Sequence, residues 1–283
     1  MYKRQELIGS SSGFKAIDGV TQGLQDEDLI VIAGRPSMGK TSLAMNIAEN
    51  IAKNDDGCVA VFSLEMSSQS LTSRMLASMA GISQSNVKTG NLTDRQWEKL
   101  IQQAKKLEEM NIFIDDTPNI SPMEIRAKSR RLAKQYRKQG GVKLVVVDYI
   151  QLMQMPGRTE NRVNELSEIS RALKYLAKEI NAPVIVLSQL NRAVEQRPNK
   201  RPQMSDLRDS GAIEQDADLI FMLYRDFVYN KNEEWKNVAE VRLVKHRNGP
   251  TKDLLLSFRD ELTRFGDLAP EVMNSYAQDR TAD

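Results

Sequence analysis

The segment 34–41, which reads GRPSMGKT, constrains the fold of this chain more than any other feature. It fits the pattern G-x-x-x-x-G-K-[ST], directly follows the apolar run Leu29–Ala33 and opens a helical pattern over Ser42–Ala52. In such a strand–loop–helix unit, backbone N–H groups turn toward phosphate oxygens and the helix N-terminus adds partial positive charge. A glycine-rich turn that carries Lys-Thr by chance is the alternative, and the flanking strand and helix disfavour it. We therefore expect a nucleotide-binding P-loop.

The P-loop predicts which residues touch the nucleotide and a metal ion. Lys40 would reach the β- and γ-phosphates, and the Thr41 hydroxyl would ligate Mg²⁺. A second apolar run, Leu144–Val147, ends in Asp148 as a Walker B strand does, so Asp148 would hold the metal ion or its water. The expected nucleotide-binding residues are Arg35, Pro36, Ser37, Met38, Gly39, Lys40, Thr41 and Ser42.

Apolar runs alternate with helical patterns along most of the chain, which predicts an α/β fold with a mostly parallel central sheet flanked by helices. The last third differs, because residues 238–244 alternate between apolar and polar and residues 254–258 follow a turn at 248–250, which predicts an antiparallel hairpin. The clearest helix spans about 161–180, and capping-box spacing at Thr93/Gln96 and Ser121/Glu124 marks two more helix starts. The other expected strands are Val59–Leu64, Ile112–Ile114, Val184–Leu187 and Leu219–Leu223.

Composition excludes several classes of protein. The chain has 283 residues, and 40% of them are hydrophobic, which is enough for a core. No apolar stretch is long enough to cross a bilayer and the N-terminus has no secretory signal, so we expect a soluble cytoplasmic protein. A single cysteine and a single histidine exclude a disulfide framework, a Cys-rich zinc site and a His-based triad. The net charge of +2 is too balanced for a protein that merely coats nucleic acid.

Two residues at expected strand ends could serve nucleotide hydrolysis. Tyr149 follows Asp148, so a water-activating carboxylate has to come from elsewhere, and Glu65 ends the run at 59–64. Ligands bind at the carboxyl ends of strands in open α/β sheets, where a glutamate could orient the attacking water or accept its proton. Gln189 follows the run at 184–187 and could hydrogen-bond a γ-phosphate. The alternatives are an acid at a helix start for Glu65 and an ordinary loop glutamine for Gln189.

Basic residues elsewhere could contact phosphate groups. Lys245 and Arg247 end the alternating strand and could stabilise charge during phosphoryl transfer, as an arginine finger does, although a solvated strand end is the alternative. Residues 191–211 are polar, contain two prolines and lack apolar periodicity, which predicts a long loop. This loop has cations but no aromatic residue, so it favours contacts to a nucleic-acid backbone over base stacking. The basic stretch 124–143 is better explained as a solvated helix face.

Taken together, these motifs resemble the C-terminal motor domain of the DnaB family of hexameric replicative helicases. A generic P-loop enzyme would share only the P-loop and the strand that ends in Asp148. The resemblance covers about residues 13–266, and its segments stand in the family's order. They are GRPSMGKT at 34–41, FSLEM at 62–66, DYIQLM at 148–153, SQLNR at 188–192, SDLRDSGAIEQDAD at 205–218, Tyr224–Asp226 and KHRNGP at 245–250.

The resemblance implies a RecA-like P-loop NTPase core. It implies an ATP-dependent DNA helicase that uses Mg²⁺, translocates on single-stranded DNA as a hexameric ring and hydrolyses ATP at subunit interfaces. Glu65 would then activate the water, Gln189 would sense the γ-phosphate, and Lys245 and Arg247 would act on nucleotide held by the next subunit. The segment that touches DNA in the ring channel corresponds to Arg208, Asp209 and Gly211, and the family usually has Glu where Asp209 stands.

The resemblance also predicts the domain organisation. Residues 1–12 would be the end of a linker, 13–266 the motor domain and 267–283 a weakly ordered tail. Family members carry an N-terminal helical domain before the motor, and nothing here corresponds to it, so we expect a fragment. Such a fragment should be a monomer or a weak homo-oligomer with impaired unwinding, whereas the full-length protein should bind a helicase loader and primase.

Two other functions remain open at this stage. The first is a RecA-like recombinase or clock-type ATPase that shares the core without unwinding DNA. The second is a nucleotide-gated adaptor that binds DNA or a loader without appreciable turnover. Residues 205–218 and 245–250 favour the helicase over the first alternative, and Glu65 argues against the second.

Overall fold

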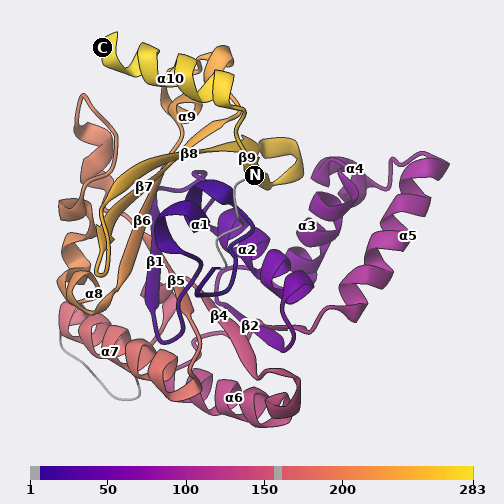
Figure 1. Ribbon diagram of the computed structural model, residues 1–283, viewed down its shortest axis with the longest axis vertical. Helices are drawn as coiled ribbons and strands as arrows, with labels where there is room; N and C mark the ends of the chain where they lie inside the picture. The colour runs from indigo at the N-terminus through magenta and orange to yellow at the C-terminus, as the bar shows by residue number, and fades with distance from the viewer. Residues whose placement is uncertain (1–6, 156–160, 283) are drawn as a thin grey trace.

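The computed structural model describes residues 7–155 and 161–282, with the backbone alone for 208–210 and 280–282. One sheet in the described residues has the order β3-β2-β4-β5-β1-β6-β7-β8-β9 (Figure 1). The strands from β3 to β6 in this order are parallel, and β7, β8 and β9 continue the sheet antiparallel, which confirms the predicted α/β class and C-terminal hairpin. The strands are β1 Leu29–Gly34, β2 Cys58–Ser63, β3 Ile112–Asp115, β4 Val142–Asp148, β5 Val184–Gln189, β6 Leu219–Tyr224, β7 Val238–His246, β8 Lys252–Arg259 and β9 Arg264–Asp267.

Helices cover both faces of the parallel strands, because alternate side chains of each strand enter two separate cores. In β1, Ile30 and Ile32 pack in the core with α1 and α2, whereas Val31 and Ala33 pack in the core with α6 and α7. Within the described part of the chain, no helix is both long and apolar enough to cross a membrane. The α-helices are α1 Lys15–Thr21, α2 Lys40–Asn54, α3 Ser68–Ala80, α4 Gln84–Thr89, α5 Asp94–Glu109, α6 Pro122–Gln135, α7 Arg162–Ile180, α8 Gly211–Asp216, α9 Asp226–Asn230 and α10 Pro270–Ala282.

Local signals set the starts of several helices. Thr93 caps α5 and Ser121 caps α6, each in the reciprocal capping box that the sequence predicts. At Ser121 the backbone N–H donates to the Glu124 carboxylate at 2.8 Å, and the Glu124 N–H donates back to the Ser121 hydroxyl at 3.3 Å. Helices α3, α4 and α5 lie to one side of the sheet (Figure 1).

The segment 191–211 is more ordered than a long loop. Two 3₁₀ helices, η3 Arg192–Gln196 and η4 Met204–Ser210, precede α8. Asn191 starts η3 by accepting the Ala193 N–H at 2.9 Å, and Val194 and Leu207 are buried in the core. The prediction of an irregular loop was therefore wrong, because single buried side chains order a segment that has no apolar periodicity.

The end of the chain is also more ordered than predicted. Helix α10 packs against the sheet through Tyr276, whose ring meets that of Trp235 edge to face at 5.1 Å between centroids. The indole N–H of Trp235 donates to Asp279 at 2.7 Å. The expected weakly ordered tail is therefore wrong for the residues in α10.

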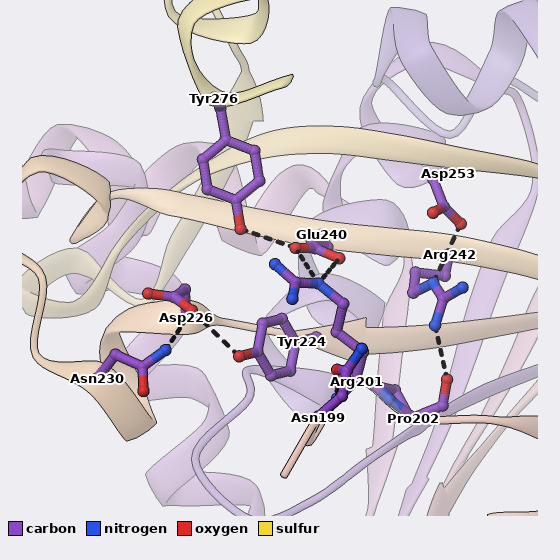
Figure 2. A network of polar contacts seen from close by, with 10 residues as sticks. All are labelled: Asn199, Arg201, Pro202, Tyr224, Asp226, Asn230, Glu240, Arg242, Asp253 and Tyr276. Carbon is purple, nitrogen blue, oxygen red and sulfur yellow. Dashed lines mark hydrogen bonds and ion pairs between the residues drawn. The ribbon is translucent and has the colours of Figure 1, made fainter. Parts of the chain in front are cut away.

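A buried carboxylate joins α10 to the segment before η4. Glu240 in β7 is fully buried, and its carboxylate accepts hydrogen bonds from the Tyr276 hydroxyl at 2.7 Å and from Arg201 Nε at 2.9 Å and 3.2 Å. Figure 2 shows Arg201 and Tyr276 reaching Glu240 from two parts of the chain. The Arg201 guanidinium also lies 4.9 Å from the ring centroid of Tyr224. Each part of this network keeps a buried charge hydrogen-bonded, as burial requires.

A small polar cavity of about 10 Å³ lies beside α2. Three of its polar atoms, Glu49 Oε1, Arg74 Nε and Ser78 Oγ, are buried and have no hydrogen-bond partner among the described residues. Burial raises the pKa of the Glu49 carboxyl to about 8, although the nearby Arg264 opposes the rise.

We expect Tyr276→Phe to lower the free energy of unfolding by about 1–2 kcal/mol, because a hydrogen bond to a buried carboxylate is lost. Chemical denaturation monitored by circular dichroism measures this difference. Tyr175→Phe is the matched control, since Tyr175 is 70% exposed on α7 and its replacement should leave stability unchanged. Equal stability of Tyr276→Phe and the unchanged chain would contradict the role of Tyr276.

We expect Glu49→Gln to stabilise the chain at pH 9 and to have little effect near pH 5. The folded-state pKa lies above the ordinary value of 4.5, so stability is lost as the pH rises from about 4.5 to about 8 and the unfolded state ionises first. Thermal midpoints of the two proteins across this range measure the effect. The exposed Glu98→Gln serves as control, and a Glu49→Gln gain that is equal at both pH values would exclude titration as its cause.

Candidate functional site

The P-loop has the backbone geometry that phosphate binding requires. Strand β1 ends at Gly34, and α2 begins at Lys40 with Gly39 at its N-cap in the left-handed region, at φ 93° and ψ 21°. A Cβ atom at Gly39 would lie 3.0 Å from the ring of Phe265, so both the backbone angle and the close approach need glycine here. The segment thus leads from a buried strand into a helix N-terminus, as the motif predicts.

Asp148 meets Thr41 although the two residues are far apart in the chain. The Thr41 hydroxyl donates to Asp148 Oδ2 at 2.7 Å, and Asp148 is only 2% exposed. Burial raises the pKa of the Asp148 carboxyl to about 6, against the hydrogen bond from Thr41. The other oxygen, Oδ1, is buried without a hydrogen-bond partner among the described residues.

This pair of residues fits a hard metal ion. Mg²⁺ is typically bound by one or two protein oxygens together with water and substrate phosphates, and a hydroxyl with a half-used carboxylate supplies such ligands. In the described ranges no three His, Cys, Asp or Glu side chains gather in a metal-binding group. Thr41 and Asp148 are therefore the protein groups that could hold the ion, and phosphate oxygens and water would have to complete its shell.

A cleft of about 540 Å³ lies over the P-loop at the carboxyl ends of the parallel strands. It brings Glu65, from the end of β2, and Gln189, from the end of β5, together with Lys40. Of the residues expected to bind nucleotide, Met38 is buried in the core instead of lining the cleft. The P-loop residues that do line it are Pro36, Ser37, Gly39, Lys40, Thr41 and Ser42.

Charges within the cleft act on one another. Lys40 Nζ donates to the Arg35 carbonyl at 3.2 Å, and burial lowers the Lys40 pKa while Asp148 and Glu65 oppose that change. Glu65 is exposed to the cleft, and its carboxylate has no hydrogen bond or ion pair with another described residue. Its position next to Lys40 leaves that carboxylate available to a water molecule.

The backbone of Gln189 is held in place, whereas its side chain faces the cleft. Gln151 Nε2 donates to the Ser188 hydroxyl at 2.9 Å and to the Gln189 carbonyl at 3.2 Å, and Gln151 Oε1 accepts the Gln189 N–H at 3.2 Å. The sequence analysis assigned no role to Gln151. Its position shortly after the Walker B strand, at the same edge of the sheet as Gln189, was the available signal.

The side chain of Arg35 points away from the cleft. Its guanidinium forms an ion pair with Glu195 at 2.9 Å and donates to the Leu190 carbonyl at 2.8 Å. Arg35 therefore ties the P-loop to the segment that follows β5, and only its backbone is left to approach a phosphate.

Arg225 supports the P-loop from behind and was also missed. It is buried at the end of β6, donates to the Ser37 carbonyl at 3.2 Å and forms an ion pair with Asp260 at 2.6 Å. Its guanidinium lies 4.4 Å from the ring centroid of Phe258. Asp260 and Phe258 line the cleft, so the β8–β9 turn forms one of its walls. A strand-end arginine beside β1 was the only sequence signal for this contact.

Lys245 and Arg247 lie outside the cleft. Antiparallel pairing places His246 opposite Leu219, at the amino end of β6, whereas the cleft lies at the carboxyl end. Lys245 Nζ donates to the Glu214 carbonyl at 2.6 Å, and Arg247 forms an ion pair with Asp218 at 3.0 Å. The two cations therefore point from the edge of the sheet opposite the P-loop.

The expected DNA-contacting residues are only partly described. Gly211 is exposed at the start of α8, whereas the side chains of Arg208 and Asp209 lie outside the described residues. Two other cations of this segment are engaged within the chain, because Arg197 pairs with Asp206 at 2.7 Å and Arg201 with Glu240. These internal pairs narrow the set of cations that could contact a nucleic-acid backbone.

Comparison with protein families and curated proteins finds close relatives. A family model described as "DnaB-like helicase C terminal domain" matches residues 9–267. The replicative DNA helicase DnaB of Geobacillus stearothermophilus is 50% identical over 264 residues, and the replicative DNA helicase DnaC of Bacillus subtilis is 48% identical over 267 residues. These matches cover 93% and 94% of this chain but 57% and 58% of the relatives, so the chain spans little more than half of their length.

Solved structures share the fold. One, which its title describes as an ATPase domain, is 39% identical with a TM-score of 0.88, and the match covers 94% of both chains. A structure titled "The Structure Of A DnaB-Like Replicative Helicase And Its Interactions With Primase" is 39% identical with a TM-score of 0.89, over 94% of this chain and 64% of that one. These likenesses confirm the RecA-like ATPase fold.

Proposed function

The chain belongs to the family of DnaB-like helicase C-terminal domains, and from this premise we propose that it is the ATP-hydrolysing motor of a replicative DNA helicase. The convergence of the P-loop, the Thr41–Asp148 pair, Glu65 and Gln189 on one cleft is the observation that carries the proposal. The motor binds ATP with Mg²⁺ in this cleft and uses hydrolysis to translocate on single-stranded DNA.

Each residue of the cleft has a role in this mechanism. The Lys40 ammonium binds the β- and γ-phosphate oxygens, and the P-loop N–H groups orient them. Mg²⁺, when bound, neutralises charge that develops on those oxygens. Thr41 and Asp148 hold the ion, and the Glu65 carboxylate takes the proton of the attacking water. Gln189 hydrogen-bonds the γ-phosphate, and its backbone is held by Gln151 while it does so.

Lys245 and Arg247 act on nucleotide bound by a neighbouring copy of the chain. They stand at the amino end of β6, and the six residues of this strand at about 3.3 Å each place them roughly 20 Å from the P-loop edge. A cation at that distance cannot contact the γ-phosphate bound by its own chain. A ring of six subunits brings the opposite edge of one copy to the cleft of the next, and hydrolysis then depends on assembly.

DNA lies in the channel of this ring. Arg208, Asp209 and Gly211 contact its phosphate backbone, which requires little sequence preference. The solved DnaB-like helicase whose title names primase suggests the same partner for the longer protein to which this motor belongs, along with a helicase loader.

We expect Glu65→Gln to lower steady-state ATP turnover by about 10²–10⁴-fold, because the amide cannot accept the proton of the water. The affinity for a fluorescent ATP analogue should stay within about twofold, since Lys40 and the P-loop are unchanged. Glu109→Gln, at the end of α5, is the control and should hydrolyse ATP at the original rate. Turnover that survives Glu65→Gln would show that another group activates the water.

We expect ATP turnover to rise more than linearly with protein concentration and to increase further with single-stranded DNA. Catalysis by Lys245 and Arg247 from a neighbouring copy requires association, and DNA contacts favour the assembled form. Steady-state hydrolysis measured over a range of protein concentrations, with and without oligonucleotide, tests both effects. Turnover that is linear in protein and indifferent to DNA would leave a P-loop ATPase without an interfacial site.

A further inference from the structure

A buried carboxylate holds Arg247 at the edge of the sheet. Asp218 stands between α8 and β6 and is only 4% exposed. Its Oδ1 accepts Arg247 Nη1 at 3.0 Å, and its backbone carbonyl accepts the Arg247 N–H at 2.9 Å. Arg247 is thus bound to Asp218 through both its side chain and its main chain, which restricts the directions that its guanidinium can take.

The second oxygen of Asp218 is occupied by other donors. Oδ2 accepts the Leu29 N–H at 2.9 Å and Lys174 Nζ at 2.5 Å. Burial alone raises the pKa of the Asp218 carboxyl, but the hydrogen bonds from Lys174, Leu29 and Arg247 outweigh burial and lower it. The carboxylate therefore stays charged, and Oδ1 is left for Arg247.

Arg247 is nevertheless open to a partner. Its side chain is 57% exposed, and the bond to Asp218 uses one of the five N–H donors of the guanidinium. The donors that remain face away from the core, toward whatever binds at this edge. A guanidinium with one fixed side and one open side loses little freedom when it binds an anion.

Lys245 is anchored in the same region. Its ammonium donates to the carbonyls of Glu214 and Gln215 at 2.6 Å and 3.2 Å, in the last turn of α8. Helix C-termini offer such unsatisfied carbonyls to cations. Both cations are therefore held by the segment 214–218, which is continuous with Gly211, the residue proposed to contact DNA.

We propose that Asp218 is a positioning residue, which holds Arg247 in the orientation that reaches nucleotide on the neighbouring copy of the chain. This inference rests on the proposed function, since Arg247 must act across a subunit interface. Asp218 itself touches neither nucleotide nor metal and acts through Arg247. Because α8 anchors Lys245 as well, a displacement of Gly211 would move both cations together.

The first test compares kcat and KM for ATP in Asp218→Asn. We expect kcat to fall about 10- to 100-fold, as for a misplaced catalytic group, while KM and the affinity for an ATP analogue stay within about twofold. Affinity is preserved because the cleft lies at the other edge of the sheet. Glu179→Gln is the matched control, since Glu179 also accepts from two guanidinium groups, those of Arg126 and Arg130, and it should leave kcat unchanged. An unchanged kcat in Asp218→Asn would overturn the proposal.

A double-mutant cycle separates positioning from a general structural role. In an Arg247→Ala background, Asp218→Asn should slow turnover no further, because the residue through which Asp218 acts is already gone. A further loss by the same factor as in the unchanged chain would show that Asp218 acts independently of Arg247, and would overturn the proposal. If Asp218→Asn does not fold, the cycle is run with Asp218→Ser, whose hydroxyl can still accept the Leu29 N–H.

Mixing of variants distinguishes failure of this inference from failure of the proposed function. A Lys40→Ala chain cannot hydrolyse ATP but still presents Asp218 and Arg247 to its neighbour. Adding it to Asp218→Asn, or to Arg247→Ala, should raise turnover per active cleft. Recovery with Arg247→Ala alone would overturn the role of Asp218, whereas no recovery with either would overturn catalysis across the interface.

Discussion

Parallel pairing of β1 with β5 on one side and β6 on the other places Gly34 beside Gln189 and Leu223 at a single edge of the sheet. Because parallel strands all end at the same edge, the P-loop, Glu65 and Asp148 reach that edge from three further turns of the chain. The short bond between Thr41 and Asp148 joins two of these strand ends directly. Every group proposed to bind or attack the phosphate in its own chain depends on this arrangement.

The antiparallel continuation of the sheet has the opposite effect. Strand β7 runs back toward the amino ends of the parallel strands, so Lys245 and Arg247 emerge at the edge farthest from their own P-loop. Two buried carboxylates support this half of the molecule, Asp218 beside Arg247 and Glu240 beneath the segment 199–203 (Figure 2). A buried charge is stable only when cations or hydrogen-bond donors surround it, and each of the two has at least two such donors.

Much of the fold was predictable because its signals are local. Apolar runs set the strands from β1 to β6, capping boxes set the starts of α5 and α6, and a turn at 248–250 set the hairpin. The elements that were missed depend on single distant contacts. Helix α10 is held by Tyr276 on Glu240, and η4 by the burial of Leu207, and neither segment has a periodic apolar pattern. The support of Ser37 by Arg225 likewise depends on how β8 and β9 fold over the P-loop.

The sequence by itself determined the chemistry available to this protein. The order and type of residues in the P-loop, in the strand before Asp148 and in the segment 245–250 were enough to indicate phosphate binding and the family. Only the tertiary structure decided which of these groups meet. Glu65 and Gln189 share the cleft with Lys40, whereas Arg247 faces outward on Asp218. The physical reason is that motifs and periodicity describe neighbours along the chain, but the distance between two strand ends depends on the strand order, which no local pattern encodes.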